Sequence, residues 1–332
     1  MILWKRPEPR GAFFCYSYWA PPLLDFWILR GYPSYFPLMV RICHPYVFYR
    51  TVRKLGYICI SLENDSLSIL CCMLYFKQFL HSQSSEWVVF IHGAGGSSAV
   101  WHKQLRDFQK DFNLLLIDLR GHGKSVEMPE AIWKQHYTFE AVTKDILEVL
   151  DHLKLPPAHF MGVSLGTILA RQLAEMAPAR VKSLVMAGAV TRLTAQSRLL
   201  VFFGNTFKRI IPFMWLYRLF AFVIMPRKQH AESRNLFIHE AQKLCQKEFI
   251  RWFKLTKDIN PLLRYFKEKD LGIPTLYVMG DQDVMFLEPV KNLIRYHKNS
   301  ILRVLDTCGH VVNVEKPDEF NQLSIAFIKN QQ

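Results

Sequence analysis

The sequence predicts an α/β fold, with a mostly parallel, doubly wound sheet that carries helices on both faces. Short apolar runs of strand length recur at residues 87–91, 113–118, 158–161, 181–188, 274–280 and 301–305. Segments with helical spacing separate most of these runs, and this alternation is typical of a parallel sheet. It stops between residues 191 and 270, where the pattern is helical. We therefore expect a core of residues 73–190 and 271–332 with one helical insertion at residues 191–270.

The first elements of the core lead to a glycine-rich loop. Residues 74–79 alternate as the first strand of a hairpin would, and residues 82–85 provide a turn into the strand at 87–91. The loop that follows, His-Gly-Ala-Gly-Gly at residues 92–96, can bring a backbone N–H close to a bound carbonyl oxygen. The next strand, at residues 113–118, is followed by a turn.

An amphipathic helix is expected at residues 139–153. Thr138 is suited to be its N-cap, and two prolines at residues 156–157 end it. Its apolar stripe consists of Phe139, Val142, Ile146, Val149 and Leu153.

The sequence Gly-Val-Ser-Leu-Gly at residues 162–166 lies between an apolar run and a helical pattern. A serine at the apex of a sharp strand-to-helix turn needs a strained backbone, and the flanking glycines remove side chains that would collide there. The hydroxyl of Ser164 then projects from the sheet, and the following helix directs its first amide groups at negative charge formed beside it. This pattern predicts a nucleophile elbow.

Polar residues follow two further predicted strands. Asp281 and Asp283 come after the strand at 274–280, and His310 comes after the strand at 301–305. A serine hydroxyl is a poor nucleophile without a base, and histidine is the usual base. The order Ser, Asp, His, each beyond the carboxyl end of a strand, indicates a catalytic triad.

These motifs together resemble those of the α/β-hydrolase family. The family patterns H-G-x-G-G, D-x-R-G-H-G-x-S, G-x-S-x-G, G-x-x-D and G-H-x-x-x-x-E-x-P occur here in order, beginning at residues 92, 118, 162, 280 and 309. The resemblance covers about residues 73–330. It implies the α/β-hydrolase fold, with a helical lid inserted after the strand that follows the elbow.

The resemblance also assigns roles to individual residues. It implies Ser164 as nucleophile, His310 as base, and Asp283 as the acid that orients the histidine. Asp281 is the rival for the acid, although its place at the strand end favours a role in the turn. The backbone N–H groups of Ala94 and Leu165 would form the oxyanion hole.

Other polar residues near these motifs favour structural roles. We expect His92 to hold its loop by a hydrogen bond, and Arg120 and His122 to shape the neighbouring wall. Cys308 lies two residues from His310 and invites a thiol mechanism, but it has no elbow.

The expected lid, residues 191–270, is both apolar and basic. It has 16 Lys or Arg against 6 Asp or Glu, which accounts for most of the formal charge of +14. Such a lid fits an anionic or amphipathic substrate, or peripheral contact with acidic membrane lipids. For each of its large apolar residues, packing in the core is the alternative to contact with substrate or lipid. These residues include Phe202, Phe203, Phe213, Met214, Trp215, Tyr217, Phe220 and Phe222.

Residues 1–72 differ in character from the rest of the chain. They hold five of the seven cysteines, many aromatic residues and scattered prolines, without helical or strand periodicity. Charged residues and prolines interrupt every apolar stretch that could serve as a signal or a membrane span. We expect an atypical N-terminal extension that is not part of the native core, with the natural start at Met73; an additional subdomain or membrane-associating arm is the alternative.

Composition limits the class of protein. The 332 residues are 50% hydrophobic and 21% charged, as in globular proteins. The sequence has no zinc-finger spacing, RNA-binding aromatic motif or long basic block, so we expect no metal, no cofactor and no nucleic acid partner. An odd number of cysteines, two of them in the core, favours a reducing cytosol.

We therefore expect a cytoplasmic serine hydrolase that cleaves a small carboxylic ester, thioester or lactone through an acyl-enzyme. One alternative on the same fold is a lyase of the menaquinone-pathway type, which acts on an anionic substrate. A further alternative is a binding protein without catalysis, which the intact triad residues disfavour.

Overall fold

The computed structural model describes residues 73–127 and 137–331, together with the backbone of five strands between residues 25 and 71. The chain divides into two compact units. The smaller, Met1–Met73 with Met128–Ile132, holds an antiparallel sheet in the order β1-β2-β3-β4-β5. Its strands are Asp25–Trp27, Leu38–Cys43, Tyr46–Thr51, Ile58–Glu63 and Ser66–Cys71. The sequence of this part predicts no regular element, because it shows neither helical nor strand periodicity.

The larger unit, Leu74–Glu127 with Trp133–Gln332, contains a seven-stranded sheet in the order β12-β11-β10-β9-β7-β8-β6. The strands are β6 (Phe76–Phe79), β7 (Trp87–Ile91), β8 (Asn113–Ile117), β9 (Ala158–Val163), β10 (Val181–Ala187), β11 (Thr275–Gly280) and β12 (Ser300–Leu305). All pairs are parallel except β6 with β8. The prediction of a mostly parallel sheet is confirmed.

The expected hairpin between residues 74–79 and 87–91 is wrong. Strand β6 pairs with β8, with Phe76 opposite Ile117 and Phe79 opposite Leu114. Strand β7 already has parallel neighbours on both sides, β8 and β9, so it has no open edge to receive β6. The free edge of β8 is the one that β6 fills.

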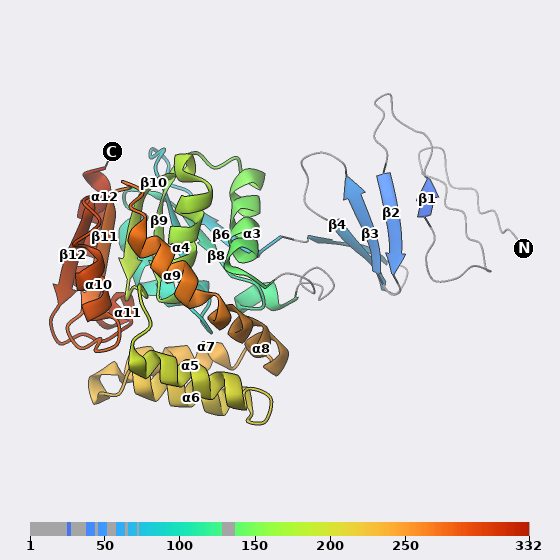
Figure 1. Cartoon of the computed structure of the whole chain (residues 1–332). Coiled ribbons are helices and arrows are strands. Elements are labelled where there is room, and N and C mark those ends of the chain that lie inside the picture. Colours follow the sequence, from blue (N-terminus) through green and yellow to red (C-terminus); the bar gives the residue numbers. More distant parts are fainter. Residues whose placement is uncertain are drawn as a thin grey trace, which may run out of the picture. The chain divides into compact units, whose positions relative to one another are not determined.

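Helices cover both faces of this sheet (Figure 1). Helices α3 (Phe139–His152) and α4 (Leu165–Met176) pack against each other on one face. Helices α1 (His102–Phe108) and α12 (Pro317–Lys329) pack together on the other. The expected cap of α3 is confirmed, because Thr138 accepts a hydrogen bond from the Ala141 amide. The remaining core elements are short: Ser98–Trp101, Gly123–Glu127, Pro178–Arg180, α10 (Leu287–Leu293) and α11 (Val312–Glu315).

Between β10 and β11 the chain forms five helices, which we call the insertion. They are α5 (Ala195–Phe207), α6 (Phe213–Ile224), α7 (Ala231–Ala241), α8 (Gln246–Lys254) and α9 (Ile259–Glu268), with short turns at Lys228–His230 and Leu255–Lys257. Helices α5, α6 and α7 lie together beside the strand ends (Figure 1). An aromatic cluster joins α6 to α7 and α8, because the Tyr217 ring lies 5.3 Å from the rings of Phe237 and Phe249.

In the part of the chain that the structure describes, no helix is long and apolar enough to span a bilayer. Of the cysteines whose side chains are described, Cys245 is exposed and Cys308 is buried, and both are free thiols. The side chains of the first five cysteines lie outside the described residues.

The centre of the core is aromatic and gives a test of its packing. Phe90 is fully buried, and its ring meets those of Trp101 at 5.1 Å and Phe108 at 5.5 Å. We expect Phe90→Ala to lower the free energy of unfolding by about 3–5 kcal/mol, because the lost contacts leave a cavity. Leu80→Ala is the control, since Leu80 is 73% exposed and its loss should cost less than about 0.5 kcal/mol. Urea unfolding measures both changes, and equal losses would contradict the packing.

Candidate active site

Ser164 occupies the turn between β9 and α4 with a strained backbone. Its φ of 53° and ψ of −118° lie in a region that side chains rarely adopt. A Cβ on Gly162 would lie 2.5 Å from the Gly166 carbonyl oxygen, and a Cβ on Gly166 would collide with the Ile91 carbonyl oxygen. The two glycines therefore allow strand, turn and helix to approach closely, as the elbow pattern predicted.

A chain of hydrogen bonds joins the three residues predicted as a triad. The His310 Nε2 atom lies 3.0 Å from the Ser164 hydroxyl oxygen. On the other side of the ring, His310 Nδ1 lies 2.7 Å from Asp283 Oδ2. Because an ionised carboxylate only accepts, Nδ1 carries the proton, and Nε2 is left to accept from the serine hydroxyl. The sheet thus brings together side chains that are 119 and 27 positions apart in the chain.

The structure distinguishes the two aspartates that follow β11. Asp283 is buried and also accepts a hydrogen bond from the Phe286 amide. Asp281 is exposed, and its carboxylate accepts from the Cys308 amide at 2.9 Å. The contact with His310 therefore belongs to Asp283, and Asp281 fixes the turn.

A glycine that the sequence analysis did not single out lets the His310 loop reach Ser164. Gly188, at the end of β10, has a φ of +51°, and a Cβ there would collide with the His310 carbonyl oxygen. The collision is invisible in the sequence, because it depends on a loop more than a hundred residues away.

Ala94 and Leu165 border the same cavity as Ser164 and His310. Among the described residues, their backbone amides donate no hydrogen bond to another protein group. Both are therefore free to receive a bound oxygen, which is what an oxyanion hole requires.

Two buried histidines hold the loop that carries Ala94. His92 accepts from the Leu119 amide at its Nε2 and donates from Nδ1 to the Gly93 carbonyl. His122 accepts from the Gly95 amide at 3.0 Å and donates from Nδ1 to the Arg120 carbonyl. Burial lowers the pKa of His92, and burial together with neighbouring His92 lowers the pKa of His122 to about 3. Both rings are therefore neutral, and both of their nitrogens are engaged in hydrogen bonds that hold the loop.

The contacts of Arg120 and Cys308 also indicate structural roles. The Arg120 guanidinium pairs with the Asp145 carboxylate and lies over the Tyr137 ring. Burial, with Glu315 nearby, raises the pKa of the fully buried Cys308 thiol. A raised pKa removes the thiolate that a cysteine nucleophile requires.

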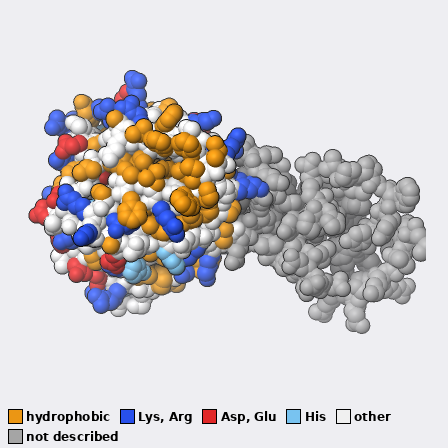
Figure 2. Space-filling view, turned by 90° about the horizontal axis from the view of Figure 1, so that it is seen from below, with side chains coloured by type: hydrophobic (Ala, Val, Ile, Leu, Met, Phe, Trp, Pro, Cys, Tyr) orange, Lys and Arg blue, Asp and Glu red, His pale blue; other side chains and the backbone are white. Residues whose placement is uncertain are grey.

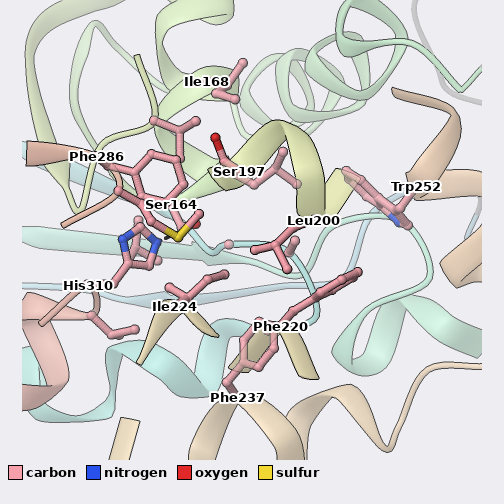
Figure 3. A pocket seen from close by; sticks show the side chains of 18 of the residues that line it. Ser164, Ile168, Ser197, Leu200, Phe220, Ile224, Phe237, Trp252, Phe286 and His310 are labelled. Carbon is pink, nitrogen blue, oxygen red and sulfur yellow. Dashed lines mark hydrogen bonds between the residues drawn. The ribbon is translucent and has the colours of Figure 1, made fainter. Parts of the chain in front are cut away.

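Ser164 and His310 open into a cavity of about 260 Å³ between the core and the insertion (Figure 3). Core residues such as Ile168 and Phe286 form one part of its wall, and Leu200, Phe220, Ile224 and Phe237 of the insertion form another. Figure 3 shows the Ser164–His310 pair toward one side of the cavity and Trp252 toward the other. The wall is apolar apart from a few polar groups.

The most polar of these groups, Glu240 of α7, was not predicted. Its buried carboxylate accepts hydrogen bonds from the Ser97 hydroxyl and from Lys243. No lysine or arginine of the described chain borders the cavity, and Arg218, Arg227 and Lys228 are exposed. The positive charge of the insertion therefore does not line the binding space.

Comparison with known proteins places the chain among hydrolases. A family model of the alpha/beta hydrolase fold matches residues 86–212. 3-oxoadipate enol-lactonase 1 of Acinetobacter baylyi is 22% identical over 254 residues, which are 75% of this chain and 91% of that protein. The structure is similar to MenH from S. aureus, with a TM-score of 0.67 and 19% identity over 77% of this chain and 98% of the other. It is also similar to the esterase EaEST from Exiguobacterium antarcticum, with a TM-score of 0.64 and 19% identity over 77% and 95% of the two chains.

The neutral His122 makes stability depend on pH. Its pKa falls from 6.5 to about 3 on folding, so unfolding takes up a proton at any pH between these values. The contribution of His122 to the free energy of unfolding is fully present above pH 6.5. It declines by about 1.4 kcal/mol per pH unit as the pH falls toward 3. When the pH is lowered from neutral to about 5, the free energy of unfolding of the wild type should fall by about 2 kcal/mol more than that of His122→Gln. Urea unfolding at the two pH values measures both changes. The exposed His152 provides the control His152→Gln, and a pH profile unchanged in His122→Gln would contradict the assignment.

Proposed function

The chain belongs to the α/β-hydrolase fold superfamily, and we propose that it is a serine hydrolase that cleaves a carboxylic ester, thioester or lactone with an apolar acyl group. One observation carries the proposal: the hydrogen-bonded series Asp283, His310 and Ser164 ends at an apolar cavity. The similarity to an enol-lactonase and an esterase supports the same class of bond.

The proposed reaction has two halves. The Ser164 oxygen attacks the carbonyl carbon while His310 Nε2 takes the hydroxyl proton, and Asp283 stabilises the imidazolium. The amides of Ala94 and Leu165 stabilise the negative oxygen of the tetrahedral intermediate. His310 returns the proton to the leaving oxygen or sulfur, which leaves an acyl-enzyme. Water, deprotonated by His310, then attacks the acyl carbon and releases the acid and Ser164.

The walls of the cavity favour an apolar acyl group. Leu200, Phe220 and Ile224 remove hydrocarbon from water, and such burial contributes about 25 cal/mol per Å². The helices of the insertion would act as the lid that keeps bulk water from the acyl-enzyme. These walls do not distinguish an ester from a thioester or a lactone, so the three remain one class of substrate.

The alternative, elimination from an anionic substrate by a lyase, is less consistent with these walls. A buried anion needs a cation or several hydrogen-bond donors, because its desolvation is costly. Among the described residues that border the cavity there is no lysine or arginine, and the charge of Glu240 is already paired with Lys243. An anionic end on the substrate would have to remain at the exterior, near the exposed cations of the insertion.

A binding protein without catalysis is also disfavoured, because binding alone does not require the hydrogen-bonded series Asp283, His310 and Ser164.

The nucleophile can be identified with a fluorophosphonate probe. We expect a single adduct on Ser164, and Ser164→Ala should abolish the adduct and lower kcat for p-nitrophenyl esters by on the order of 10⁶. The substitution removes one oxygen, so the melting temperature should be nearly unchanged. Labelling at another residue, or ester turnover that survives the substitution, would refute the proposed nucleophile. Probe labelling without ester turnover in the wild type would favour the lyase.

The two aspartates give a matched pair. Asp283→Asn should lower kcat by about 10⁴, because an amide that donates to Nδ1 favours the wrong histidine tautomer. Asp281→Asn keeps an oxygen that can accept from the Cys308 amide, so its kcat should stay within about tenfold of the wild type. Steady-state kinetics on the same ester measures both. Equal losses would mean that Asp283 has no special part in the reaction.

A further inference from the structure

The insertion carries a large apolar surface on the side away from the cavity. We call it the outer face; it consists of Leu199, Phe202, Phe203, Ile210, Trp215, Leu219 and Phe222, all of them exposed. Trp215 is 69% exposed and Ile210 is 78% exposed. Figure 2, which views the molecule from the side of α5, α6 and α7, shows hydrophobic side chains gathered into one area with Lys and Arg among and around them. Single exposed apolar residues are common, but a continuous group of aromatic ones indicates an interaction site.

The spacing of these residues places them on one side of each helix. In α6 the exposed residues Trp215, Leu219 and Phe222 are separated by four and three positions, which is one helical stripe. Helix α5 presents Leu199, Phe202 and Phe203 in the same manner. The two helices are neighbours, because a Cβ on Gly204 of α5 would lie 3.1 Å from the Phe220 ring of α6.

The other side of the same helices already has partners. Phe220 and Ile224 of α6 border the cavity, and so do Leu200 and Val201 of α5. Both helices therefore have two apolar sides. One side packs against the cavity and the aromatic cluster, and the other side is exposed. Apolar sides of a helix are normally buried, and no described residue covers the outer face.

The charge around the outer face has one sign. Residues 192–231 contain seven Lys or Arg and no Asp or Glu. They are Arg192, Arg198, Lys208, Arg209, Arg218, Arg227 and Lys228, and in the described part of the chain none forms an ion pair with a carboxylate. Arg198 and Arg218 fall on the same stripes as Phe202 and Trp215. Burial, together with Lys257, Arg209 and Lys254, lowers the pKa of Lys208, as expected where cations gather.

We propose that the outer face of α5 and α6 docks onto the surface of an anionic phospholipid bilayer. Trp215 and the phenylalanines would enter the boundary between headgroups and acyl chains, and the cations would meet lipid phosphates. A second copy of this chain is a poor partner, because two such faces would oppose cations to cations. An apolar, one-signed surface also suits lipids, since they need no matched directional hydrogen bonds. This inference concerns where the protein acts and holds whichever bond it cleaves.

The test is flotation of the full-length protein with vesicles. One set contains phosphatidylcholine alone, and the other contains equal amounts of phosphatidylcholine and phosphatidylglycerol. We expect the wild type to float with the anionic vesicles at low salt, to float less at high salt, and to bind the neutral vesicles weakly. Trp215→Ser with Phe202→Ser should reduce the partition coefficient by at least about tenfold. Arg198→Gln with Arg218→Gln should reduce it by about fivefold for each cation removed.

Two variants control for exposed apolar groups in general. Leu80 and Tyr296 are 73% and 62% exposed and belong to neither helix, so Leu80→Ser and Tyr296→Ser should bind vesicles as the wild type does. Fluorophosphonate labelling of Ser164 and the melting temperature confirm that each variant is folded. If labelling fails while vesicle binding persists, the proposed function fails and the docking surface stands.

Several results would overturn the docking surface. One is a wild type that does not float with anionic vesicles, and another is an equal loss in the control variants. A dimer in analytical ultracentrifugation that Trp215→Ser dissociates would assign the face to a second copy. Binding to polyglutamate as strong as binding to anionic vesicles, and unaffected by Trp215→Ser, would point to an acidic protein instead.

Discussion

The site depends on the strained turn at Ser164. A residue at φ 53° and ψ −118° costs about 1–3 kcal/mol, and it persists only where its surroundings hold it. Here the surroundings are the central strands, because Gly166 lies against the Ile91 carbonyl and the Ser164 amide donates to the Ala187 carbonyl at 3.0 Å. The same packing brings the loop after β7 beside the start of α4. Ser164 and the amides of Ala94 and Leu165, which we propose as nucleophile and oxyanion donors, are thus positioned by one contact of the core.

The polar groups around the site serve its rigidity. His92 and His122 are neutral and each joins two backbone groups, so the Ala94 loop is held without charge near the proposed oxyanion hole. Glu315 has a similar part near the base: its carboxylate accepts from the Gly309 amide and from the Ser233 hydroxyl of the insertion. The loop that carries His310 is therefore tied to α7, and the insertion contributes to the geometry of the base as well as to the cavity.

Helices α5 and α6 separate two apolar environments. One side completes the cavity above Ser164, and the other carries exposed aromatic residues among cations. The positive charge that dominates the composition of the insertion lies outside the binding space. Charge and cavity lining are therefore separate features of this molecule: the wall of the cavity is largely apolar, and cations lie on the exposed side of the insertion.

Local sequence patterns were sufficient for the sheet, the capped helix at 139–152 and the elbow, because strand length, caps and glycine spacing are properties of neighbouring residues. Motif order also placed Ser164, Asp283 and His310 at strand ends, where parallel topology brings them together. The partner of β6, the collision that makes Gly188 necessary and the presence of Glu240 in the cavity were not predictable, because each depends on residues far apart in the chain. The sequence by itself determined which residues are apolar in α6. Only the tertiary structure decided that Phe220 faces the cavity and Trp215 faces solvent, because both fit the same helix and only packing against neighbouring helices fixes its rotation.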